Sequence, residues 1–117
     1  MSELEGFDPT ADVESAARQL LAQEITFEEF SDVFLRGRLW CKKPPEPGFY
    51  AIGSAGDGWV PVYTSDRALA FAEGPCSWFT ATGRDLLELA PEGYAFVVDR
   101  GTDRQMAIVP VTKENAA

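Results

Sequence analysis

Three adjacent polar residues, Thr64, Ser65 and Asp66, are where catalysis would first be sought in this sequence. They follow a short apolar run, and some hydrolases place a nucleophilic serine where a strand turns into a helix. Such a serine needs a general base and flanking glycines, but the chain has no histidine and no glycine beside Ser65. Ser65 is better explained as a helix cap, with Asp66 next to the helix dipole. We therefore expect no catalytic residue and no enzyme.

Metal and cofactor sites are not predicted either. Asp57, Asp99 and Asp103 lie in expected turns, but the stretch around the last two lacks the regular alternation of carboxylates of a calcium loop. The glycine-rich stretch at 53–58 leads into an expected strand, whereas a phosphate-binding loop leads into a helix. We expect no metal and no cofactor.

The two cysteines, Cys41 and Cys76, are far apart and form no CxxC pair. The first ten residues have neither the basic start nor the apolar stretch of a secretory signal. No apolar run approaches the roughly 18 residues of a membrane span. We therefore expect a cytoplasmic protein with two reduced, buried thiols.

The net charge of −9 comes from the N-terminal part of the chain. Residues 1–32 contain nine acidic residues and one basic residue, whereas the rest of the chain contains ten acidic and nine basic residues. A negative field repels phosphate backbones and anionic lipids, so we expect neither nucleic acid nor membrane as a partner. A basic protein partner is compatible with this charge, and so are solvated helix faces that only aid solubility.

Apolar periodicity predicts an N-terminal pair of helices joined by a short link. The first begins at Asp12 and the second at Thr26, where Thr26 and Glu29 form a capping box. Two short helices are expected to begin at Ser65 and after Thr82. Six strands are expected, at residues 38–43, 49–53, 59–63, 76–81, 94–99 and 105–111.

These elements predict an α+β (mixed α/β) domain. An N-terminal helical hairpin and two further short helices pack on a mixed β-sheet of five to six strands. The first two strands are expected to form a hairpin across the proline-rich stretch 44–47, which could also serve as a polyproline ligand. Residues 1–11 are expected to be a flexible acidic leader, residues 12–112 the single domain and residues 113–117 a tail.

The candidate interaction surface combines tryptophans with acidic residues of the helical hairpin. Tryptophans on strands belong to the core by default, but two of them exposed on one sheet face would form a binding platform. The acidic face of the hairpin would suit a basic partner. The residues concerned are Trp40, Trp59, Trp78, Glu24, Glu28 and Asp32.

Two stretches, WVPVYTSDRALAFA and SWFTATGRDLLELAPEGYAFVVDRG, carry a pattern of spaced motifs. A strand first ends in Pro-x-Tyr-Thr-Ser, and a helix and a second strand follow it. After them come Gly-x-Asp-Leu-Leu and then Pro-x-Gly, which precedes an apolar strand. The residues are Pro61, Tyr63, Thr64, Ser65, Gly83, Asp85, Leu86, Leu87, Pro91 and Gly93. In this pattern residues 26–111 resemble the SseB-type N-terminal domain (enhanced serine sensitivity protein B).

The resemblance implies a mixed α/β domain without established enzymatic activity. Related actinobacterial proteins are found beside type VII secretion genes, which implies an accessory role, either secretion-associated or regulatory. We therefore expect a non-enzymatic protein–protein interaction or accessory module. The alternatives are an acidic immunity or antitoxin-like protein that neutralises a basic partner, and a small-molecule-binding domain. A homodimer could form through the edge of the strand at 105–111, although Pro110 would blunt that edge.

Overall fold

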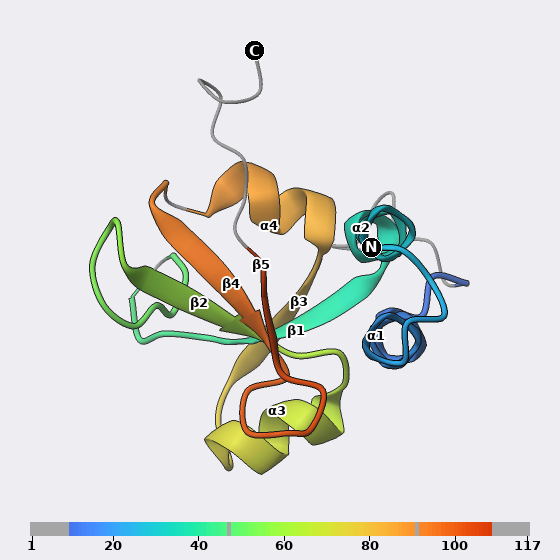
Figure 1. Ribbon diagram of the computed structural model, residues 1–117. Coiled ribbons are helices and arrows are strands. Elements are labelled where there is room, and N and C mark those ends of the chain that lie inside the picture. The colour runs from blue at the N-terminus through green and yellow to red at the C-terminus, as the bar shows by residue number, and fades with distance from the viewer. Residues whose placement is uncertain (1–9, 47, 91, 109–117) are drawn as a thin grey trace.

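The computed structural model describes residues 10–46, 48–90 and 92–108, which form four helices and five strands (Figure 1). The helices are α1 (Val13–Leu21), α2 (Phe27–Arg36), α3 (Asp66–Glu73) and α4 (Gly83–Leu89). The strands are β1 (Arg38–Lys42), β2 (Gly58–Val62), β3 (Trp78–Thr82), β4 (Tyr94–Val98) and β5 (Met106–Ile108). This arrangement confirms the predicted α+β class.

The strands of the described part form two sheets. In the first, β4 is central, parallel to β2 and antiparallel to β5, as its apolar sequence predicts. The second sheet is the antiparallel pair of β1 and β3. An isolated bridge between Trp40 of β1 and Tyr63, directly after β2, joins the two sheets. The predicted single mixed sheet is thus two sheets, which this bridge connects.

Helices pack on both faces of the strands. On one face, α1, α2 and α4 enclose the main core, to which α2 contributes Phe30 and α4 contributes Leu86. On the other face, α3 packs Leu69 against Tyr63 in a second, smaller cluster. Figure 1 shows α4 above the strands, α1 and α2 to their right, and α3 below. The strands therefore have a layer of three helices (α1, α2 and α4) on one face, whereas the other face is less covered and carries α3.

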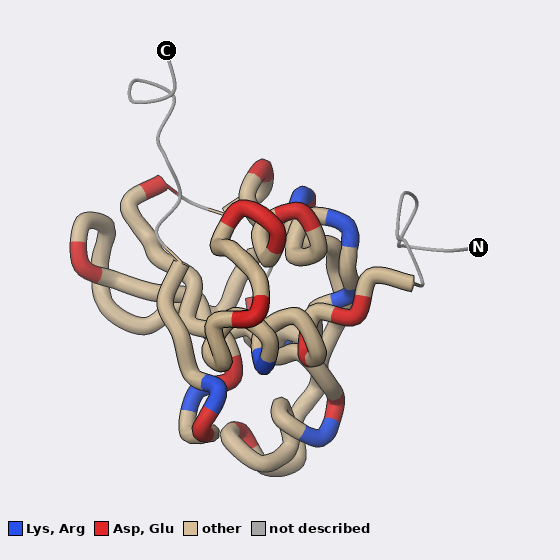
Figure 2. Tube along the Cα trace, turned by 45° about the vertical axis from the view of Figure 1, so that its right-hand side comes forward, with Lys and Arg blue, Asp and Glu red and all other residues tan. Residues whose placement is uncertain are grey.

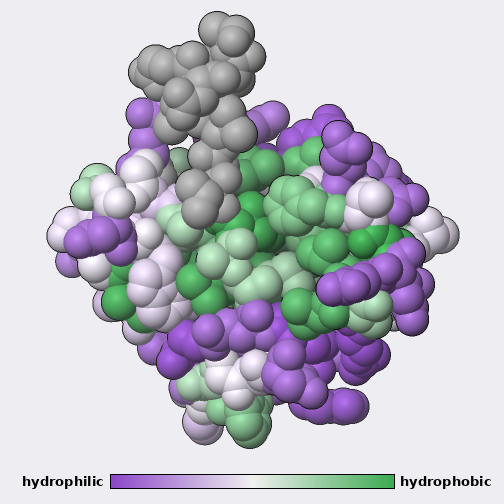
Figure 3. Space-filling view, in the orientation of Figure 1, coloured by the Kyte–Doolittle hydropathy of each residue, from purple (hydrophilic) through white to green (hydrophobic). Residues whose placement is uncertain are grey.

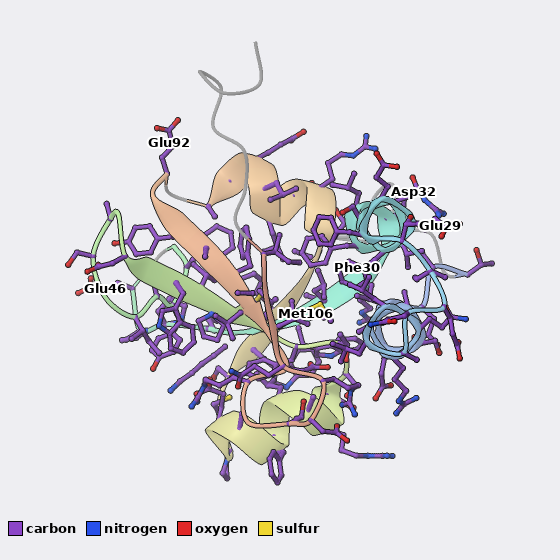
Figure 4. All side chains as sticks on the ribbon, viewed as in Figure 1. Glu29, Phe30, Asp32, Glu46, Glu92 and Met106 are labelled. Carbon is purple, nitrogen blue, oxygen red and sulfur yellow. The ribbon has the colours of Figure 1, made fainter. Side chains whose placement is uncertain are left out.

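The helical hairpin forms as predicted. The Thr26 side chain accepts a hydrogen bond from the Glu29 amide, at 3.1 Å, and the Glu29 side chain accepts one from the Thr26 amide, at 2.8 Å. Phe30 and Phe34 are buried one turn apart, with ring centroids 6.0 Å apart. Figure 4 shows Phe30 on the side of α2 toward the strands, while Glu29 and Asp32 lie on its outer side.

The start of α4 also follows the predicted cap. Thr82 accepts a hydrogen bond from the Asp85 amide at 3.2 Å. The next residue, Gly83, lies directly against α2, where a Cβ would overlap the carbonyl oxygen of Phe34. Only glycine allows this close approach of the two helices.

The residues Thr64 and Ser65 serve the fold. The Ser65 side chain caps α3 by accepting a hydrogen bond from the Ala68 amide at 3.0 Å, as predicted. Thr64 donates from its amide and its hydroxyl to the two oxygens of Asp99, at 2.8 and 2.7 Å. Asp99 is fully buried and directly follows β4. This pair therefore fastens together the carboxyl ends of the parallel strands β2 and β4.

Arg104 connects Asp99 to the helical layer. Its Nε donates to Asp99 at 3.3 Å, and its Nη2 lies 3.5 Å from the Glu14 carboxylate of α1. The buried carboxylate of Asp99 thus has both hydrogen-bond donors and a counter-charge. Asp99 joins the strands to the first helix.

The predicted hairpin of residues 38–43 and 49–53 is wrong. β1 pairs instead with β3 over five residues, and only Ile52 of the second stretch bridges to a strand, at Trp59. Phe49 packs its ring on Phe79 of β3, with centroids 5.8 Å apart. The stretch is therefore used for packing, while the more distant β3 provides the hydrogen-bond partners of β1.

The two cysteines are free and lie on opposite faces of the strands. Cys41 is buried in the main core, and burial raises the pKa of its thiol to about 12. Cys76 packs on the smaller cluster and is only partly buried. The prediction of two buried thiols is thus correct for Cys41 and wrong for Cys76.

Some predicted segments lie outside the described residues. These are the tail, Pro110, Pro47 of the proline-rich stretch, and residues 1–9 of the acidic leader. Of the strand expected at residues 105–111, the described part forms β5, at the edge of its sheet beside β4.

We expect Asp99→Ala to lower the free energy of unfolding by about 3 kcal/mol, because it leaves buried donors of Thr64 and the Arg104 charge without their acceptor. Asp99→Asn should cost less, since it keeps one acceptor oxygen and tolerates the positive φ of 54° at this position. Urea unfolding followed by fluorescence measures both. Asp103→Ala is the control, because its 94% exposed carboxylate also pairs with Arg104. Equal stability of Asp99→Ala and this control would contradict the account.

Candidate functional site

The residues of β1 alternate between the core and the less covered face. Leu39 and Cys41 are buried in the main core, so Arg38, Trp40 and Lys42 point to the opposite face. The register pairs Lys42 with Trp78 and Trp40 with Thr80 of β3. Because directly paired residues share a face, Trp78 lies beside Lys42 and diagonally from Trp40.

The third tryptophan reaches the same face from the other sheet. Val60 and Val62 of β2 point into the main core, so Trp59 and Tyr63 point away from it. The bridge between Tyr63 and Trp40 places these residues next to β1. We call this surface the tryptophan face. It consists of Trp40, Trp59, Trp78, Tyr50, Arg38, Lys42 and Arg100.

The structure thus brings together the three predicted tryptophans. Trp78 is 49% exposed, whereas Trp40 and Trp59 are half-buried. The predicted condition of two exposed tryptophans on one sheet face is therefore not met, since one ring is exposed and the other two are partly exposed. Tryptophan, tyrosine and arginine are the residue types enriched at the centres of protein interfaces.

Each cation of the tryptophan face lies over an aromatic ring. The guanidinium of Arg38 lies 5.1 Å from the ring centroid of Trp40, and that of Arg100 lies 6.0 Å from Trp59. The Lys42 ammonium lies 4.6 Å from the ring of Tyr50. Cation–π contacts of this kind orient both partners and keep the charges next to the apolar rings.

A buried carboxylate lies under this face. The Glu73 side chain is only 4% exposed and accepts a hydrogen bond from the Tyr63 hydroxyl at 2.5 Å. Arg100 donates to the same oxygen at 3.3 Å, and the Lys42 ammonium lies 3.6 Å from the other oxygen. Glu73 is the last residue of α3, so these contacts join α3 to β1, to the end of β2 and to the segment after β4.

The titration of this cluster follows from its contacts. Burial alone would raise the pKa of Glu73, but the hydrogen bonds from Tyr63 and Arg100 and the charges of Arg100 and Lys42 outweigh burial and hold the pKa below its usual value of 4.5. Burial raises the pKa of Tyr63, and its hydrogen bond to Glu73 raises this pKa further. The carboxylate therefore stays charged and the phenol stays protonated near neutral pH, which suits a fixed positioning cluster.

Sequence reasoning missed Glu73 and Arg100. Glu73 stands at the end of an expected helix and Arg100 in an expected turn, 27 residues apart, and only the tertiary fold brings them together. The alternation of Arg38, Trp40 and Lys42 with apolar residues was the one available signal for a cation-bearing face.

The predicted acidic residues lie elsewhere. Glu24 and Glu28 are exposed beside the turn between α1 and α2, and Asp32 is exposed on α2, where it pairs with Arg36 at 2.9 Å. Figure 2 shows acidic positions along this helical pair. They belong to the layer on the opposite side of the strands from the tryptophan face.

Apolar side chains accompany these acids. Leu21 ends α1 and is 48% exposed, and Phe27 begins α2 and is 54% exposed. Figure 3 shows apolar surface in the middle of this view, with hydrophilic side chains along its right and lower border. The helical hairpin therefore presents a second surface that combines apolar and acidic groups.

An open cleft of about 440 Å³ lies between the start of α3, α1 and the segment after β4. Its carboxylates, Glu14 and Asp103, both lie near Arg104, at 3.5 and 3.7 Å, and Arg18 lies 3.3 Å from Glu14. Charges paired in this way do not form the two free, converging carboxylates of a general acid–base site. The cleft gives little support to the small-molecule alternative.

Neither a metal-binding cluster nor a membrane-spanning helix occurs in the described part of the chain. Within residues 10–46, 48–90 and 92–108, no three or more cysteine, aspartate or glutamate side chains gather as they would around a metal ion. In the same part of the chain, no helix has the length and apolar character needed to cross a membrane.

Comparison with known proteins gives one family. The family described as SseB protein N-terminal domain matches residues 13–112 of the chain. No curated protein and no solved structure matches this chain.

We expect Glu73→Gln to destabilise the protein in a pH-dependent way. Because the pKa of Glu73 is lowered on folding, its charge stabilises the fold above the unfolded pKa near 4.5, and this contribution is lost as the pH falls through the lower folded pKa. Urea unfolding of wild type and variant should therefore differ most at neutral pH and least near pH 3. The exposed Glu88→Gln is the control. A difference that does not change between pH 7 and pH 3 would contradict the assigned contacts.

Proposed function

Since this chain belongs to the SseB protein N-terminal domain family, we propose that it is a non-enzymatic accessory protein that acts by binding another protein. The observation that carries the proposal is the tryptophan face, where three tryptophans and three stacked cations share one surface. Truncation of such residues typically causes the largest losses of binding energy in protein interfaces.

The residues that could have served catalysis support the same proposal. Ser65 caps α3, and Thr64 is held by the buried Asp99. Glu73 is occupied by Tyr63, Arg100 and Lys42. These groups have structural partners in place of a substrate.

The finer role follows the family resemblance. We propose that the protein is secretion-associated or regulatory, and that it works in the cytoplasm. The related actinobacterial proteins encoded beside type VII secretion genes are the support for a secretion-associated role.

A second candidate function rests on the helical hairpin. Glu24 and Glu28 are exposed and form no ion pair within the described residues, and they lie near the exposed Leu21 and Phe27. This surface would suit an acidic immunity or antitoxin-like protein that neutralises a basic partner. It is the alternative to binding through the tryptophan face.

We expect Trp78→Ala to reduce the amount of partner captured from the source lysate by at least about tenfold, because its ring is the most exposed of the three tryptophans in the proposed interface. Quantitative mass spectrometry of captured proteins measures the change. Leu89→Ala on α4 is the matched control, since Leu89 is 69% exposed and lies outside the tryptophan face.

The double variant Glu24→Gln/Glu28→Gln separates the two candidates. The leading proposal predicts that it captures the same partner as wild type. Loss of the partner in this variant, with full capture by Trp78→Ala, would establish the acidic alternative instead. Equal losses in Trp78→Ala and Leu89→Ala would reject the tryptophan face as the binding surface.

A further inference from the structure

We propose that the tryptophan face binds an acidic, extended segment of a protein partner; this inference rests on the proposed function. We infer that this segment is acidic because the positive charges of the face exceed its negative charges. Arg38, Lys42 and Arg100 supply three positive charges, and Glu73 is the one carboxylate paired with any of them in the described structure. The face therefore carries an excess of positive charge within a protein of net charge −9.

Arg38 is the first point of attachment. It is exposed, is stacked on Trp40, and forms no ion pair with any residue that the structure describes. A guanidinium over an aromatic ring keeps N–H donors free, and these match a carboxylate in a bidentate pair. A partner carboxylate would therefore meet a cation that already lies over the Trp40 ring.

Arg100 supplies a second cation. Its Nη2 contacts Glu73, but its side chain is 37% exposed. The exposed part of the guanidinium can therefore receive a partner's oxygen acceptor. Both observations indicate a ligand that brings oxygen acceptors.

The strand geometry gives the spacing of the ligand. Arg38 and Lys42 lie four residues apart on the same side of β1, which corresponds to about 13 Å in an extended strand. An extended partner segment that follows β1 would match both cations with carboxylates at positions i and i+4. An apolar residue between them would lie over the exposed ring of Trp78, on the β3 side of Trp40, because Trp40 itself packs against the cluster of Tyr63 and α3.

A short acidic peptide suits this face better than a nucleic acid does. Aromatic rings with cations also bind single-stranded nucleic acids, but a polyanion extends over many charges and would be repelled by the net charge of −9. A segment with two or three carboxylates stays within the local positive region, because charges farther than about 10 Å are screened in 0.1 M salt.

The test is a fluorescence titration, since all three tryptophans of the chain belong to this face. The probe is the peptide Ser-Gly-Glu-Ser-Leu-Ser-Glu-Gly-Ser, and its counterpart has both glutamates replaced by glutamine. We expect the acidic peptide to bind at least about tenfold more tightly than the glutamine peptide. Arg38→Gln should remove this preference, and the exposed Arg67→Gln on α3 should keep it.

Four results would overturn the proposal. The first is equal binding of the two peptides, and the second is an unchanged preference of Arg38→Gln for the acidic peptide over the glutamine peptide. The third is binding of a thymidine 12-mer, in place of the peptide, that depends on Arg38. The fourth is salt-sensitive self-association that Arg38→Gln abolishes. The last would identify a second copy of the chain as the occupant. Circular dichroism confirms that each variant is folded.

Failure of this inference can be told from failure of the proposed function. If Trp78→Ala loses the lysate partner while both peptides bind equally, the face still binds protein but its occupant is not acidic. If Trp78→Ala also keeps the lysate partner, the tryptophan face is not the binding surface.

Discussion

The buried carboxylate of Glu73 is the interaction on which the arrangement of the tryptophan face depends. It receives Tyr63, Arg100 and Lys42, which come from three different parts of the chain. Burying a carboxylate is costly unless it is paired and hydrogen-bonded, and here all three partners meet that requirement. The same contacts hold two cations close to aromatic rings. The acidic helical hairpin lies on the other side of the strands, so the fold separates negative charge from this small positive face.

Local chemistry made much of the fold predictable. The caps at Thr26, Ser65 and Thr82 depend on residues three positions apart, and all three are observed. The apolar sequence of β4 indicated a central strand, which it is. The partner of β1 was not predictable in this way, because pairing depends on contacts about 40 residues apart in the sequence, and the nearer stretch at 49–53 had a similar apolar content.

The candidate site was predictable only in part. The tryptophans could be selected by residue type, and the alternation in β1 placed Trp40 between two cations on one side of a strand. That Trp59 and Trp78 join them depends on the register of β3 and on the bridge between the sheets. Glu73 offered no signal, since an acidic residue at a helix end is ordinarily solvated and its three partners are set by the tertiary fold.

Collisional quenching of tryptophan fluorescence by iodide and by caesium tests the central claim most directly, namely that the three tryptophans share a face with excess positive charge. The net charge of −9 alone would favour caesium. The account predicts that iodide quenches the folded protein more strongly at constant ionic strength, and that caesium becomes the stronger quencher once the chain is unfolded in urea. Stronger quenching of the folded protein by caesium would contradict it.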